Sequence, residues 1–263
     1  MSDLRLAALQ ALACPEPEAK VALTLALDLT GPLDASAQLE PPATPLPGRP
    51  TRPQLVPHTA LKPGALSTPA GLAALLHSIA HIEFNAINLA LDVCWRFAGM
   101  PERFYRDWLR IAQEESQHFS LLREHLRSMG FDYGDFDAHN ALWDMAERTR
   151  HDILARIALV PRTLEARGLD ASPAVKRKLL SAGDKRGGEI LDVILRDEIG
   201  HVAAGNHWFG HLCAERGLDP VATYAELAER YQAPRLRAPF NLEARRLAGF
   251  SQAELDALQQ TSR

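Results

Sequence analysis

Cysteine is scarce in this sequence, and the few cysteines are not spaced as metal ligands. Three occur among 263 residues, at Cys14, Cys94 and Cys213, and none belongs to a Cys-x-x-Cys pair. Their spacing excludes a zinc ribbon and a rubredoxin-type iron centre, which both need such pairs. Scattered cysteines are typical of a reducing compartment, so we expect a cytoplasmic location.

Long apolar runs and an excess of one charge are also absent. No uninterrupted apolar stretch reaches the roughly 18 residues that indicate a membrane-spanning helix. The N-terminus lacks the basic and apolar segments of a signal peptide, so we expect none. With 29 basic and 33 acidic residues, the net charge is −4. This balance gives no general electrostatic reason to expect binding to nucleic acid or to a membrane.

Helical periodicity dominates the middle of the chain. The pattern predicts four long helices, over residues 68–97, 101–129, 139–167 and 186–216. Pro161 should kink the third helix one turn before Glu165, and Gly168 should end it. Residues 168–185 would then be a connection. Helices of this length are typical of a helical bundle.

The segments on either side of residues 68–217, the predicted bundle, have a different composition. Residues 1–67 combine a first helical segment with an arm whose many prolines prevent regular helix. Residues 218–263 predict short helices. We expect the arm to lie on the domain, and a solvated loop is the simplest interpretation of its basic side chains. Those that could instead contact a ligand are Arg49, Arg52, His58 and Lys62.

A Glu-x-x-His motif occurs twice, each time with a further glutamate upstream. The first copy consists of Glu83, Glu115 and His118, and the second of Glu165, Glu198 and His201. The upstream glutamate precedes the motif by 32 residues in the first copy and by 33 in the second. Other glutamates could replace Glu165, but neither Glu147 nor Glu189 reproduces this spacing. The pattern is therefore an internal duplication.

The spacing within the motif has a structural reason. On an α-helix, residues three apart differ by about 300° and rise about 4.5 Å, so their side chains leave the same face. A single pair is usually solvated. Two such pairs, with two further glutamates, supply four carboxylates and two imidazoles, which is the ligand set of di-iron and di-manganese carboxylate proteins. Iron and manganese suit these ligands, and zinc does so less exclusively.

Three segments carry a resemblance to a known family. The runs 81–87, 161–168 and 197–201 resemble a bacterial family of ferritin-like domains of unknown function, and the similarity covers nearly the whole chain. It implies an all-α, ferritin-like antiparallel four-helix bundle with the six ligands given above. It also implies that Glu114 and Asp197 hydrogen-bond the second ring nitrogen of the histidine ligands. A more distant similarity is to the bacterial tRNA-modifying di-iron hydroxylase, which shares the Glu-Ala-Arg at the third-helix ligand.

These observations lead to one main hypothesis and several alternatives. We expect a di-iron oxidase or oxygenase that uses O₂, an external electron donor and an unknown substrate. Iron handling with ferroxidase activity, or a structural site filled with zinc or manganese, are the alternatives, and a homodimer is also open. A tRNA substrate would need phosphate contacts, although solvated helix faces explain the basic clusters more simply. Those clusters are Arg103, Arg106 and Arg110, and Arg235, Arg237, Arg245 and Arg246.

Overall fold

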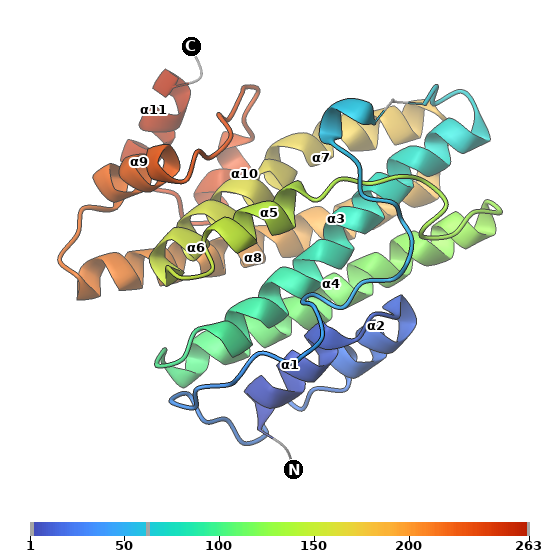
Figure 1. Ribbon diagram of the computed structural model, residues 1–263. Coiled ribbons are helices and arrows are strands. Elements are labelled where there is room, and N and C mark those ends of the chain that lie inside the picture. The colour runs from blue at the N-terminus through green and yellow to red at the C-terminus, as the bar shows by residue number, and fades with distance from the viewer. Residues whose placement is uncertain (1–2, 62–63, 262–263) are drawn as a thin grey trace. The chain divides into compact units, whose positions relative to one another are not determined.

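The protein is built from helices joined by turns and loops (Figure 1). The computed structural model describes residues 3–61 and 64–261. These residues form no strand, and their one β-bridge joins Leu55 to Ala138. The all-α fold class is therefore confirmed.

The chain divides into two compact units, Met1–Ala141 and Leu142–Arg263. Each is described by itself below. The predicted boundaries after residues 67 and 217 stay a prediction.

The first unit is organised around a helical hairpin. Its helices are α1 (Leu4–Ala13), α2 (Pro17–Leu25), the short 3₁₀ helix η1 (His58–Ala60), α3 (Pro69–Arg96) and α4 (Glu102–Ser128). The long helices α3 and α4 pack side by side, α1 packs on α3, and α2 packs on α4 (Figure 1). The two predicted long helices of this region are confirmed to within one or two residues.

Local signals define the ends of this hairpin. The Thr68 hydroxyl accepts a hydrogen bond from the Gly71 amide at 3.1 Å and so caps α3. Gly99 and Gly130 follow α3 and α4 with φ values of +83°, which a residue with a side chain rarely adopts. The side chain of Ile82 is an exception to the burial of α3, since it is 41% exposed.

Helix α3 is the core helix of its unit. It is the one helix in the described part of the chain that is long and apolar enough to cross a membrane. However, 61% of its most apolar 18-residue window is buried, and its buried residues include Glu83 and Asp92. This burial is typical of the central helix of a soluble protein.

The proline-rich arm packs against the helices of the first unit, and hydrogen bonds from Arg5 hold it there. The buried Arg5 guanidinium donates to the carbonyl oxygens of Cys94 at 2.8 Å and Trp95 at 3.0 Å, at the end of α3. It also donates to carbonyl oxygens of the arm, including that of Ala37 at 2.7 Å. Farther along the arm, the Gly48 amide donates to the Leu12 carbonyl at 2.9 Å. The expectation of an ordered arm is met among the described residues.

The second unit contains most of the remaining helices. They are α5 (Ala141–Arg148), which begins at the unit boundary, α6 (Ile153–Leu159), the π-helix η2 (Val160–Glu165), α7 (Ala166–Ser181), α8 (Lys185–Glu215), α9 (Pro220–Arg230), α10 (Leu242–Leu247) and α11 (Gln252–Thr261). Helix α8 packs against α6, η2 and α7. A capping box begins α11: the Ser251 amide donates to the Glu254 carboxylate at 2.8 Å, and the Glu254 amide donates to the Ser251 hydroxyl at 3.3 Å.

The third predicted helix is the part of the fold that the sequence describes least well. It is broken between α5 and α6, and at Pro161 the chain forms the π-helix η2 rather than a simple kink. Gly168 does not end it, so the predicted connection over residues 168–185 is wrong. Helix α7 continues to Ser181, because burial of Leu169 outweighs the local helix-breaking signal. The left-handed glycine that follows the helix is Gly183, with φ +87°.

A close contact between α8 and η2 depends on a glycine. A Cβ atom added to Gly205 would lie 2.9 Å from Cβ and 3.2 Å from Cγ of Pro161. The proline ring is rigid, so a larger residue at position 205 would push the two helices apart. In contrast, apart from its two chain neighbours and the backbone of its own helix, no described atom lies within 4 Å of a Cβ added to Gly210, farther along α8.

We therefore expect opposite effects from the same substitution at these two glycines. Gly205→Ala should lower the free energy of unfolding by about 1–3 kcal/mol through overpacking. Gly210→Ala should leave it unchanged or raise it by up to about 1 kcal/mol, because alanine favours helix. Urea unfolding followed by circular dichroism measures both. An equal effect of the two substitutions would contradict the close packing at Pro161.

Candidate metal centre

Three predicted ligands meet in the core of the first unit. Glu83 lies on α3, and Glu115 and His118 lie one turn apart on α4. The ring nitrogen Nδ1 of His118 lies 3.2 Å from Oε2 of Glu83 and 3.3 Å from Oε2 of Glu115. The ligand atoms of the three residues lie within 4.8 Å of one another. The i, i+3 spacing of the motif thus has the predicted effect on α4.

The electrostatics of this group are unusual for a protein core. Glu83 is 4% exposed, and Glu115 and His118 are each 1% exposed. Burial by itself would lower the pKa of His118, but hydrogen bonds and negative charge from Glu115 and Glu83 raise it to about 11. At neutral pH the ring is therefore an imidazolium. One positive charge then faces two carboxylates.

This set of side chains fits a divalent metal ion. Carboxylate oxygens and an imidazole nitrogen are the ligands that iron, manganese and zinc accept. A cation would offset the repulsion between the buried carboxylates, and binding would displace the proton of the imidazolium. A buried Glu/His group that could hold a metal ion is therefore present.

The second copy of the motif lies on α8 in the second unit. Glu198 is 6% exposed and His201 is fully buried. Oε1 of Glu198 lies 3.6 Å from Nδ1 of His201, so these two side chains again share one helix face. The third member, Glu165, is half-buried at the last residue of η2. That Glu165, Glu198 and His201 are metal ligands stays a prediction.

The other acids considered from the sequence lie in more open surroundings. Glu114 pairs with Arg110 at 2.8 Å, and Asp197 pairs with Arg196 at 2.8 Å. Their predicted hydrogen bonds to ligand histidines remain untested. Glu189, a rival of Glu165, is exposed on α8 and pairs with Arg186.

A cluster of aromatic rings adjoins the first Glu/His group. Phe84 and Phe119, which follow Glu83 and His118 in the sequence, have ring centroids 5.1 Å apart. Tyr133 lies 5.2 Å from the first ring and 5.0 Å from the second. These ring contacts pack the loop after α4 against the hairpin beside Glu83 and His118. The sequence reasoning did not single out Tyr133, which reaches the hairpin from the loop after α4.

A histidine on α3 ties this loop to the hairpin. Nδ1 of His81 lies 2.8 Å from the Tyr133 hydroxyl, and Nε2 lies 3.1 Å from the carbonyl oxygen of His139. Burial lowers the pKa of His81 to about 4, so the ring is neutral at pH 7. These contacts give His81 a structural role in holding the loop after α4.

The four basic residues of the arm that could contact a bound molecule lie in different surroundings. Arg49 lines a cavity of about 40 Å³, together with Tyr133 and residues of α3. Arg52 and His58 are exposed, and Lys62 lies outside the described residues. Contact of any of them with a ligand stays a prediction.

The basic cluster on α4 is paired within its own helix. Each arginine has an acidic partner one turn away: Arg103 with Asp107, Arg106 with Glu102, and Arg110 with Glu114. In the second cluster, Arg245 is 1% exposed and pairs with Asp170 at 2.6 Å. The pairs on α4 agree with the simpler interpretation of a solvated helix face. A tRNA substrate stays an untested alternative.

Comparison with known proteins assigns the chain to a family. The model of the family described as "Protein of unknown function (DUF455)" matches residues 13–256, so the chain belongs to this family. A protein of Haemophilus influenzae named "Uncharacterized protein" is 51% identical over 214 residues, which are 79% of this chain and 74% of the relative. No solved structure matches. The resemblance to ferritin-like proteins therefore remains a prediction.

The buried His77 on α3 should make the fold sensitive to mild acid. Nε2 of this ring accepts a hydrogen bond from the Gly134 amide at 2.9 Å, which requires the neutral form at that nitrogen. Burial lowers the pKa of His77 from 6.5 to about 4. As the pH falls, the unfolded chain takes up this proton first. The stabilisation is therefore complete above pH 6.5 and is lost as the pH falls towards 4.

We expect His77→Gln to flatten this dependence, because glutamine offers a hydrogen-bond acceptor that does not titrate. The free energy of unfolding of the natural protein should fall by up to about 1.4 kcal/mol more per pH unit than that of the variant. Urea unfolding at several pH values between 4 and 7 measures the slopes. The exposed His207, changed to Gln, is the control. Equal slopes for the natural protein and His77→Gln would contradict the assignment.

Proposed function

We propose that this protein is a ferritin-like metalloprotein that holds two iron ions and activates O₂ to oxidise or hydroxylate an organic substrate. The main support is the buried group formed by Glu83, Glu115 and His118. Two carboxylates without access to water are unfavourable in a core unless a cation accompanies them. The same residues have the donor atoms that iron accepts.

The second copy of the motif would supply the other ligands. We propose that Glu165, Glu198 and His201 complete a dinuclear centre in a four-helix bundle of the ferritin-like kind. Support comes from the repeated spacing in the sequence and from the shared, buried helix face of Glu198 and His201. Each copy contributes an upstream glutamate and a Glu-x-x-His pair, as in the di-iron carboxylate proteins.

The chemistry follows from this assignment. Bound ferrous ions would supply the redox capacity for O₂ reduction, and an external donor would return the electrons. The carboxylates of Glu83 and Glu115 would hold the ions, and His118 would exchange its ring proton for a metal bond. Phe84 and Phe119 would exclude water from one side of the centre. The fold itself names no substrate, and tRNA remains one alternative among organic substrates.

Metal analysis tests this proposal directly. Anaerobically purified protein, loaded with ferrous iron and then exposed to air, should bind about two irons per chain and develop a new optical absorption. Glu115→Ala and His201→Ala should each abolish both signals, because both copies of the motif belong to one centre. Matched controls are Glu189→Ala and His207→Ala, which change exposed residues of the same types.

The possible results separate the alternatives. Retention of one iron by each ligand variant would show two independent sites and contradict the dinuclear centre. Iron oxidation without oxidation of any added substrate would favour iron handling. Tight zinc binding with no reaction of the iron-loaded protein towards O₂ would overturn the oxidase proposal and favour a structural metal.

A further inference from the structure

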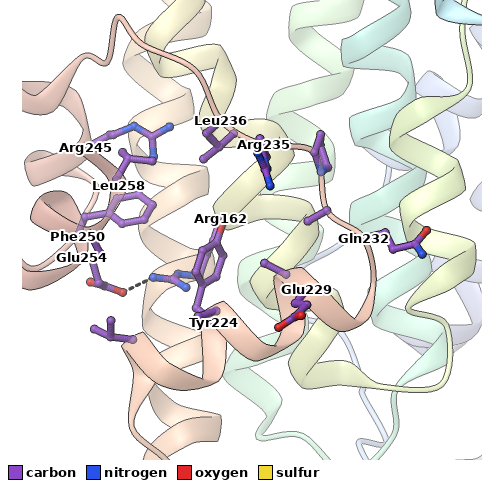
Figure 2. A pocket seen from close by; sticks show the side chains of 16 residues that line it. Arg162, Tyr224, Glu229, Gln232, Arg235, Leu236, Arg245, Phe250, Glu254 and Leu258 are labelled. Atoms are coloured by element: carbon purple, nitrogen blue, oxygen red, sulfur yellow. Dashed lines mark hydrogen bonds and ion pairs between the residues drawn. The ribbon is translucent and has the colours of Figure 1, made fainter. Parts of the chain in front are cut away.

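A large cavity in the second unit has no part in the metal centre. Its volume is about 730 Å³, and η2, α9, the segment after α9, α10 and α11 all line it (Figure 2). Binding sites for small molecules typically enclose about 300–1,000 Å³. The cavity is therefore large enough for a metabolite with one or two rings.

A buried arginine forms the inner wall of this cavity. Arg162 of η2 is 4% exposed. Its Nε donates to Oδ1 of Asn206 at 2.5 Å, and its Nη2 forms an ion pair with Glu254 (Figure 2). The third nitrogen, Nη1, is buried and has no hydrogen-bond partner among residues 3–61 and 64–261. An unsatisfied buried N–H group is costly, so this nitrogen favours a ligand with an acceptor oxygen.

Aromatic rings surround the same guanidinium. Its central carbon lies 5.4 Å from the ring centre of Tyr224 and 5.2 Å from that of Phe250, and both rings line the cavity. Alanine and leucine side chains supply much of the remaining wall. Such walls favour a ligand with an apolar body, held by ring contacts as well as by burial.

Two of the three arginines that line the cavity are already paired, Arg162 with Glu254 and Arg245 with Asp170, so Arg235 is the basic lining group open to an anion. Glu254 also takes part in the cap of α11. The exposed Glu229 is the acidic lining group that remains. Arg235 is exposed on the segment after α9 and can approach a bound ligand.

We propose that this cavity binds a small organic anion, in which a carboxylate or phosphate group is attached to an apolar, ring-containing body. The anionic group contacts the guanidinium of Arg235 at the side of the cavity next to Arg162, and the body lies against Tyr224 and Phe250. The proposal does not depend on the metal centre, because every lining residue belongs to the second unit and none is a proposed metal ligand.

Fluorescence binding with the full chain tests this proposal. The probe is 1-anilinonaphthalene-8-sulfonate, displaced by 2-naphthoate, by 2-naphthyl phosphate or by the neutral 2-naphthylmethanol. Both anions should displace it at least about threefold more tightly than the alcohol, as expected for one partly exposed ionic contact. The stronger of the two anions identifies the preferred head group. All measurements include EDTA, so a bound metal cannot be the anion's partner.

Three variants locate the binding site. Arg235→Gln should weaken displacement by the anions by at least about threefold, whereas Arg237→Gln changes an exposed arginine outside the lining and should have no effect. Ala228→Phe should weaken probe binding by narrowing the cavity. Circular dichroism verifies that this variant folds, and the Arg235 comparison stands without it.

Three results would overturn the proposal. One is equal displacement by the alcohol and the anions. Another is an equal effect of the Arg235 and Arg237 substitutions, which would indicate general attraction of anions to a basic surface. The third is unchanged probe binding by a folded Ala228→Phe variant. None of these results bears on the iron content, so the metal proposal is tested separately.

Discussion

The burial of two carboxylates between α3 and α4 is the constraint on which the first unit depends. Glu83 and Glu115 occupy positions where apolar residues would pack a helical hairpin, and both are almost completely buried. Without a cation between them their repulsion would separate the helices. The His118 imidazolium provides one positive charge. A proton on His118 thus offsets part of the negative charge, and a bound metal ion would displace that proton.

Three other buried basic side chains have a structural role at the ends of helices. Arg5 donates to carbonyl oxygens at the end of α3, Lys20 donates to the Leu12 carbonyl at the end of α1 at 2.7 Å, and Arg156 donates to the Ala146 carbonyl in the last turn of α5. The last carbonyls of a helix lack partners within the helix and carry partial negative charge. Three fully buried basic side chains thus donate hydrogen bonds to carbonyl groups at the ends of helices.

Much of the first unit could be predicted from the sequence, because its signals are local. Thr68 and Pro69 begin a helix, Gly99 and Gly130 end two, and the i, i+3 motif places Glu115 beside His118. In the second unit, burial of residues such as Leu169 determines where helices continue. This burial depends on distant parts of the chain, so neighbouring residues in the sequence do not predict it. The cavity was not predicted either, since its wall combines Arg162 with residues of two later stretches of the chain, 221–236 and 245–258.

The π-helix η2 makes the second unit sensitive to chain length. Ala166 donates its amide to Pro161 five residues back, so η2 contains one residue more than an α-helical turn would need. Loss of one residue here would let α6 and α7 join as a continuous α-helix, with the two parts rotated by about 100° relative to each other. Such a chain would keep its helices while moving Arg162 and Glu165 to new faces. In alignments of this family, a one-residue gap within residues 160–165 would therefore mark a different packing of the second unit rather than a simple difference in length.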